Sequence, residues 1–230
     1  MGQRLYTDYD KVIRFIIDNE EIFDEYEKKY ILEYTSRGHK KGKMIPDLIR
    51  EVYDNLDLLE YEDNMYLAFI DLLDDKFQYK ERSITEVGGG IIPSLAKRIS
   101  SKQTTGKITV YDPRLSRREH SNDNFTLVRE KFYSDTPVGD TDLLIGFMPC
   151  EATYNIIDSA TRNNIDFMIA LCEGGPHGDI FDFFENDQDW LNTILYLAER
   201  GVEDSNMGTL EKIYLKDYHN PYPVIYNKRK

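Results

Sequence analysis

The chain has 230 residues, enough for one large domain, or for one domain with a helical extension, around a sizeable core. Its 42 acidic residues outnumber its 29 basic residues, and the net charge of −13 disfavours extensive nucleic-acid binding because phosphate backbones are repelled. No apolar run is long enough to span a bilayer, no apolar signal core is visible, and two cysteines make no disulfide framework, so we expect a cytoplasmic protein without a membrane partner.

The first 80 residues are expected to be entirely helical. Apolar and aromatic side chains recur at helical spacing from Val12 to Tyr34 and again from Ile45 to Leu59. A third helix, Met65 to Phe77, is apolar on more than one face and is therefore expected to be buried. We expect residues 1–80 to form a helical cap on a second domain, residues 81–230. A lid or a substrate-selecting surface is the alternative.

Residues 82–230 alternate between strand and helix patterns, which predicts an α/β sheet. The expected strands are Ile84–Val87, Ile108–Tyr111, Phe125–Val128, Asp142–Phe147 and Asp166–Leu171. The expected helices are Pro93–Ser101, Glu151–Asn163 and one through Trp190 and Tyr196, and a closing antiparallel hairpin is expected from Leu210–Leu215 and Pro223–Tyr226.

A glycine bend follows the first of these strands. Gly88, Gly89 and Gly90 permit a tight turn and a close approach of backbone to a ligand. Asp112 ends the next strand, at about the separation of a nucleoside-binding βαβ unit, and could accept the two hydroxyls of a ribose. Position 93 is a proline, so the third glycine of the dinucleotide pattern is missing. This favours a ligand without a pyrophosphate, such as S-adenosylmethionine, over a nucleotide-dependent oxidoreductase.

The order of elements and the terminal hairpin resemble the class I S-adenosylmethionine-dependent methyltransferases over residues 80–230. Glu86–Gly90 match the first motif of that family, Asp112 matches the acid after its second strand, and Phe147–Cys150 fall where the family has its catalytic-loop motif. The resemblance implies a seven-stranded, mostly parallel, Rossmann-like sheet with a C-terminal antiparallel hairpin. It also implies S-adenosylmethionine as cofactor and an unidentified methyl acceptor as partner.

A finer likeness extends over Asp142–His177, which looks like a methyltransferase branch that includes tRNA 2′-O-methylating enzymes. That branch reads L-H-A-C…P-C-C…H, whereas this chain has Met148 in place of the first histidine and Glu173 in place of the second cysteine of the pair. These departures and the acidic charge favour a small molecule or a protein side chain as acceptor. A relative of the RNA 2′-O-methyltransferases is the alternative.

The resemblance implies a donor site in which the three glycines pass under the methionine and ribose portions. Glu86 would order the turn or hold the amino group of the donor, Asp112 would accept the ribose hydroxyls, and Glu130 would lie near the adenine. The full expected set is Glu86, Gly88, Gly89, Gly90, Asp112, Pro113, Glu130, Phe147, Met148 and Pro149.

The acceptor side is expected on the same rim, because ligands bind outside the carboxyl ends of the strands. Cys150 and Cys172 end neighbouring strands, and Glu151 and His177 follow them. One interpretation makes His177 or Glu151 the general base and both cysteines part of the acceptor pocket. The other makes the cysteines small buried fillers and Glu151 a first-turn acid of a helix. No metal site is expected, because zinc ligands usually occur as closely spaced pairs.

Two further hypotheses stay open. A non-catalytic module that senses S-adenosylmethionine or another nucleoside would keep the glycines and Asp112 without needing Cys150, Glu151 or His177. The basic segments Arg37–Lys43 and Arg114–Arg118 are expected to be solvated, or to form one anion-binding patch together.

Overall fold

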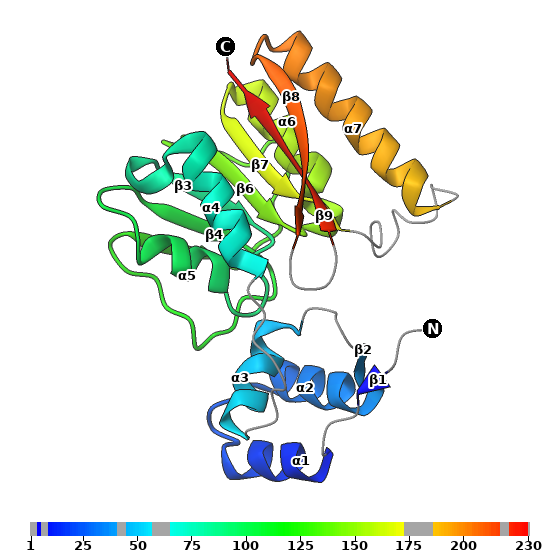
Figure 1. Ribbon diagram of the computed structural model, residues 1–230. Coiled ribbons are helices and arrows are strands. Elements are labelled where there is room, and N and C mark those ends of the chain that lie inside the picture. Colours follow the sequence, from blue (N-terminus) through cyan, green and yellow to red (C-terminus); the bar gives the residue numbers. More distant parts are fainter. Residues whose placement is uncertain are drawn as a thin grey trace.

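The computed structural model describes residues 4–5, 9–40, 45–56, 65–172, 186–216 and 221–229, and the statements below concern these residues. It contains a seven-stranded sheet with helices on both faces and a group of helices at one end of the sheet (Figure 1). The expected α/β fold is confirmed. Within the part of the chain that is described, no helix is long and apolar enough to cross a membrane.

The strand order of the sheet is β5-β4-β3-β6-β7-β9-β8. β3 to β7 pair in parallel, whereas β9 runs antiparallel to β7 and β8 antiparallel to β9, which is the expected C-terminal hairpin. The chain turns back between β3 and β6, so a crevice is expected at the carboxyl ends of these two strands. The strands are β3 (Ile84–Val87), β4 (Ile108–Tyr111), β5 (Phe125–Val128), β6 (Leu143–Phe147), β7 (Asp166–Ala170), β8 (Thr209–Lys216) and β9 (Pro221–Lys228).

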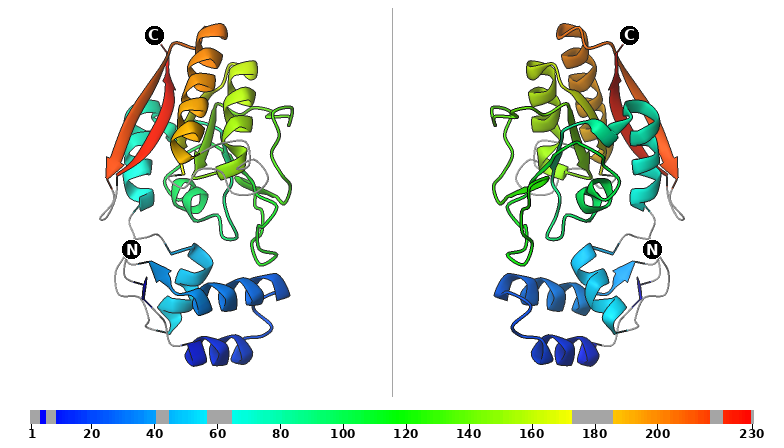
Figure 2. Two further views of the ribbon diagram at one scale, coloured as in Figure 1. Left: turned by 90° about the vertical axis from the view of Figure 1, so that its right-hand side faces the viewer. Right: turned by 90° about the vertical axis from the view of Figure 1, so that its left-hand side faces the viewer.

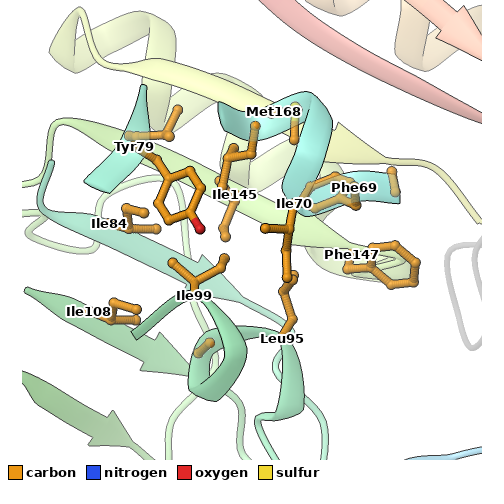
Figure 3. Close-up of a cluster of buried hydrophobic side chains, with 14 of the residues drawn as sticks. Phe69, Ile70, Tyr79, Ile84, Leu95, Ile99, Ile108, Ile145, Phe147 and Met168 are labelled. Carbon is orange, nitrogen blue, oxygen red and sulfur yellow. The ribbon is translucent and has the colours of Figure 1, made fainter. Parts of the chain in front are cut away.

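Side-chain alternation along the buried strands divides the core into two layers. Leu143 and Ile145 of β6 pack on one face of the sheet, and Leu144 packs on the other. The first face is covered by α4 (Met65–Phe77), η1 (Tyr79–Glu81) and α5 (Ser94–Ser100), as the close-up in Figure 3 shows. The second is covered by α6 (Thr153–Asn163), which follows η2 (Cys150–Ala152), and by α7 (Asp187–Asp204) (Figure 2).

The helices α1 (Tyr9–Asp18), α2 (Glu25–Arg37) and α3 (Asp47–Asn55) enclose an apolar cluster of their own. Ile91, from the loop after β3, belongs to this cluster, so these helices pack directly beside the glycine bend (Figure 1). The helix α4 does not belong to it, because its buried side chains pack in the core of the sheet.

The expectation that residues 1–80 are entirely helical is wrong in one respect. The two-residue strands β1 (Arg4–Leu5) and β2 (His39–Lys40) pair antiparallel. Gly38 ends α2 with a positive φ of 62°, which lets the chain leave the helix directly into β2.

Arg118 joins the N-terminal helices to the loop after β4. Its guanidinium donates to both carboxylate oxygens of Glu51 at 3.0 and 3.2 Å, and to Glu27 at 3.4 Å. Glu27 is buried, and its other oxygen accepts the Asp24 amide in a capping box at the start of α2. The guanidinium also lies 4.9 Å from the ring centroid of Phe23. Charge pairing and stacking therefore hold α2 and α3 against the carboxyl-end loops.

Candidate functional site

The three glycines of the bend after β3 are required for two reasons, backbone conformation and space. Gly88 and Gly90 have positive φ angles of 81° and 77°, a conformation in which a side chain is strained. A Cβ on Gly88 would also lie 3.1 Å from the backbone of Pro149. Gly89 is required for space, because a Cβ there would lie only 2.4 Å from a methyl group of Val110. The bend therefore brings the backbone close to β4 and to the loop after β6.

The Glu86 carboxylate lies beneath the glycine bend and bonds to the helix that follows it. It is buried, and its Oε2 accepts the backbone amide of Ala96 at 3.1 Å. Ala96 lies in the first turn of α5, and Pro93, which precedes this helix, supplies no side-chain cap. The carboxylate thus satisfies one of the unpaired amides at the start of the helix and fixes α5 relative to β3. Of the two expected roles for Glu86, this geometry favours the ordering of the turn.

Asp112 faces the glycine bend. Its side chain is 2% exposed, and its Oδ2 accepts the Gly90 amide at 2.9 Å. Burial alone would raise the pKa of this carboxyl, but the hydrogen bonds and charge of Arg114, with the Gly90 amide, outweigh it and the pKa is lowered. The carboxylate is therefore held ionised at the point where the bend and β4 meet.

Arg114 occupies the remaining positions on this carboxylate. Its backbone amide and Nε donate to Asp112 Oδ1 at 2.8 and 3.1 Å, and its Nη2 donates to Oδ2 at 2.9 Å. A carboxylate offers about four lone-pair positions, and with the Gly90 amide all are in use. A ligand hydroxyl can therefore bind Asp112 only if the guanidinium moves. The Arg114 side chain is 56% exposed, so it can turn outward without losing a buried environment.

Two hollows adjoin the Asp112 segment. One is a cavity of about 170 Å³, small for a ligand site and lined mainly by apolar and aromatic side chains with Arg114 as its charged group. The other is a more open hollow of about 690 Å³ that includes Tyr111, Pro113, Glu130 and Tyr133. The described residues of the smaller cavity are Tyr30, Pro46, Leu48, Tyr66, Gly88, Gly89, Gly90, Ile91, Ile92, Arg114, Phe147 and Met148.

The end of β6 and the loop that follows it form another part of the cavity wall. Phe147 is buried and makes edge contacts with Tyr66 and Phe69 of α4 at centroid distances of 4.9 and 5.3 Å. Met148 and Cys150 both have positive φ angles, 53° and 48°, although neither is a glycine. Backbone strain of this kind is concentrated at functional sites and persists only where packing enforces it.

The expected donor residues therefore fall into groups. Gly88, Gly89, Gly90, Phe147 and Met148 border the smaller cavity, and Asp112 meets the bend through Gly90. Pro113 and Glu130 border the open hollow on the other side of the same segment. Pro149 packs against Gly88, and Glu86 lies beneath the turn.

The expected acceptor residues do not converge on this cavity in the part of the chain that is described. Cys150 and Cys172 are half-buried, with Cys172 near enough to raise the pKa of the Cys150 thiol, and Glu151 is exposed on η2. His177 lies outside the described residues. No group of three or more histidine, cysteine or acidic side chains among the residues described could hold a metal ion.

Several cavity residues have no signal in the sequence. Tyr30, Pro46 and Leu48 reach the site from α2, α3 and their connection, and Tyr66 comes from α4. The tyrosines of α2 recur at helical spacing, but that pattern alone indicates packing, and Tyr30 does stack on its neighbours Tyr26 and Tyr34.

The expectation that Arg114–Arg118 is a solvated basic segment is wrong for Arg118, which is half-buried, whereas Arg114 is exposed but paired. Arg114 is paired with the buried Asp112, and Arg118 with the buried Glu27 and the partly exposed Glu51.

No family model matches the sequence, and no curated protein does. Solved structures match the fold. A proposed S-adenosyl-L-methionine-dependent methyltransferase from Methanococcus maripaludis is 13% identical, with a TM-score of 0.50 over 84% of this chain and 98% of that chain. Precorrin-6y C5,15-methyltransferase from Geobacter metallireducens is 16% identical, with a TM-score of 0.48 over 73% of this chain and 88% of that chain. The chain has the fold of the class I S-adenosylmethionine-dependent methyltransferases.

Proposed function

We propose that the chain is an S-adenosylmethionine-dependent methyltransferase that acts on a small molecule or a protein side chain. The observation that carries the proposal is the contact of the buried Asp112 carboxylate with the Gly90 amide at 2.9 Å. A glycine bend and an acid at the carboxyl ends of adjacent parallel strands make up the arrangement that binds a nucleoside in open α/β sheets. The fold shared with the Methanococcus protein supports the proposal.

In this proposal the residues around Asp112 hold the donor. Ribose hydroxyls take the positions on Asp112 that Arg114 now fills, and the adenine lies in the hollow beside Pro113 and Glu130. The three glycines pass beneath the methionine portion. When bound, S-adenosylmethionine supplies an activated methyl group. The contribution of the chain is to orient the reacting groups and to exclude water from them.

The acceptor is proposed to approach from the side of Phe147 and Met148, against Tyr66 and Leu48. These side chains offer an apolar and aromatic surface, which suits a small, largely apolar acceptor better than a nucleic-acid backbone. If the acceptor must lose a proton, Glu151 or His177 is the proposed base, because both follow strands that end on this rim.

Calorimetric titration with S-adenosylmethionine, S-adenosylhomocysteine and NAD tests the proposal. We expect saturable binding of both sulfur compounds and none of NAD, because the bend lacks the third glycine that a pyrophosphate requires. Saturable binding of NAD with no response to either sulfur compound would overturn the proposal and favour a nucleotide-dependent oxidoreductase.

A second candidate function is a non-catalytic sensor of S-adenosylmethionine. One observation favours it: neither Cys150 nor Glu151 is among the described residues that line the cavity. A sensor would bind the donor but form no S-adenosylhomocysteine with any acceptor, and Glu151→Ala would leave its ligand response unchanged. A transferase would form S-adenosylhomocysteine in step with a methylated product.

A further inference from the structure

Two cysteines that lie far apart in the sequence meet at the rim of the sheet. β6 and β7 are parallel neighbours with Phe147 opposite Ala170, and the Met148 amide donates to the Ala170 carbonyl at 2.8 Å (Figure 1). The ladder therefore continues to the last residues of both strands. Cys150 lies three residues beyond this register on one chain segment, and Cys172 two residues beyond it on the other.

The two side chains lie close together. The Cys150 thiol donates to the Met148 carbonyl oxygen at 3.4 Å, and Cys172 lies near enough to raise the pKa of this thiol. Both residues are half-buried, so a small reagent can reach them from solvent. The positive φ of Cys150 shows that this loop is held in a strained conformation.

We propose that Cys150 and Cys172 are a site of reversible oxidation, at which a peroxide converts the thiol pair to an intramolecular disulfide. This goes beyond the proposed function, and it does not depend on the identity of the donor or the acceptor. The disulfide ties the loop after β6 to the end of β7. Met148 of that loop borders the cavity, so the modification fixes one wall of the candidate site.

The chemistry assigns different parts to the two sulfurs. The interaction with the neighbouring Cys172 thiol and burial raise the pKa of Cys150 far above its usual value, against a smaller opposing effect of the Arg114 charge. Cys150 therefore keeps its proton, which it donates to the Met148 carbonyl oxygen, and Cys172 is assigned as the attacking sulfur. It attacks the O–O bond, forms a sulfenic acid, and the peroxide leaves as water or an alcohol. Cys150 then attacks that sulfur, the S–O bond breaks, and a second water leaves. The two thiols lose two electrons and two protons, which the peroxide takes up.

The two cysteines are the only ones in the chain, which makes the test a simple thiol count. Reduced full-length protein is treated with a small excess of hydrogen peroxide. It is then denatured in the presence of N-ethylmaleimide, which labels free thiols, and its mass is measured by intact mass spectrometry. We expect a species that has lost two hydrogens and carries no maleimide, and dithiothreitol should restore both adducts. Two maleimide adducts after peroxide, or a disulfide between two chains on a non-reducing gel, would overturn the proposal.

Single-serine variants test the roles of the sulfurs. With its attacking sulfur intact, Cys150→Ser should accumulate sulfenic and sulfinic acid at Cys172. Cys172→Ser should leave Cys150 largely reduced at the same peroxide dose. Thermal melts of the reduced variants, unchanged from the parent, establish that both fold. Equal oxidation of the two variants would contradict the assignment of Cys172 as the attacking sulfur.

Discussion

The rim formed by β3 and β4 differs in construction from the rim formed by β6 and β7. On the first, positive φ angles fall on glycines, and the buried acids Glu86 and Asp112 have hydrogen-bond partners within the same rim. On the second, positive φ angles fall on Met148 and Cys150, and the polar groups are two half-buried thiols and an exposed acid. The first rim is built to hold one fixed shape, whereas the second stores strain beside reactive groups. We infer that the rim of β3 and β4 recognises the donor, and that the rim of β6 and β7 carries the groups that can change chemically.

The largest effect is expected from Gly89→Ala, which tests whether the first rim is as tightly packed as its geometry indicates. The new Cβ would meet the buried, stiff side chain of Val110, and we expect a loss of about 2–3 kcal/mol in the free energy of unfolding, measured by urea denaturation. The control is Gly139→Ala. There φ is 51° and no neighbouring atom lies within 4 Å of the added Cβ, so only backbone strain of about 1 kcal/mol lowers the free energy of unfolding. Equal losses would contradict the packing argument.

Asp112→Ala should weaken binding of S-adenosylmethionine by about 1–3 kcal/mol, because the ribose hydroxyls lose a buried, ionised partner. Calorimetry measures the dissociation constant, and Asp123→Ala, on the exposed turn before β5, is the matched control. An unchanged dissociation constant would show that Asp112 is not part of the donor site. It would also contradict the inference that the rim of β3 and β4 recognises the donor.

Arg114→Met tests the same carboxylate, but here donor binding is expected to become tighter instead of weaker. If the donor must displace the guanidinium from Asp112, removing the charge while keeping the stem should tighten donor binding roughly tenfold, or about 1.4 kcal/mol. The variant should also melt at a lower temperature, because Asp112 loses its partner. Arg117→Met, at an exposed neighbouring position, should change neither quantity. Weaker binding by Arg114→Met would mean that the guanidinium itself contacts the donor.

The pH dependence of stability gives the smallest effect. Asp112 has a pKa below its usual value of 3.8, so its ionised form stabilises the folded state above that value. The contribution is lost as the pH falls through the lowered pKa, and stability should therefore decline more steeply below about pH 4 in the parent than in Asp112→Asn. Urea denaturation at a series of pH values measures the difference. Identical slopes for the two proteins would contradict the lowered pKa.

The sequence predicts the sheet well because its signals are local. The runs that become β6 and β7, which are buried along their whole length, the glycine bend and the acid after β4 are each indicated by local composition or by backbone requirements. The Asp112 contact with the bend follows from parallel pairing of β3 with β4, which that local pattern already implies.

The rest of the site depends on contacts between distant segments. Arg114 is paired only because Asp112 is buried two residues away, and Tyr30 reaches the cavity only because Arg118 holds α2 and α3 over the bend. Neither consequence is visible in the spacing of charges or tyrosines. The same holds for Cys150 and Cys172, which the register of β6 and β7 brings together.

A crystal structure with S-adenosylhomocysteine bound tests the central claim most directly. The account predicts both ribose hydroxyls on the Asp112 carboxylate, the Gly90 amide still beside it, and the Arg114 guanidinium turned away. A ligand bound elsewhere, with Arg114 still paired to Asp112, would contradict it.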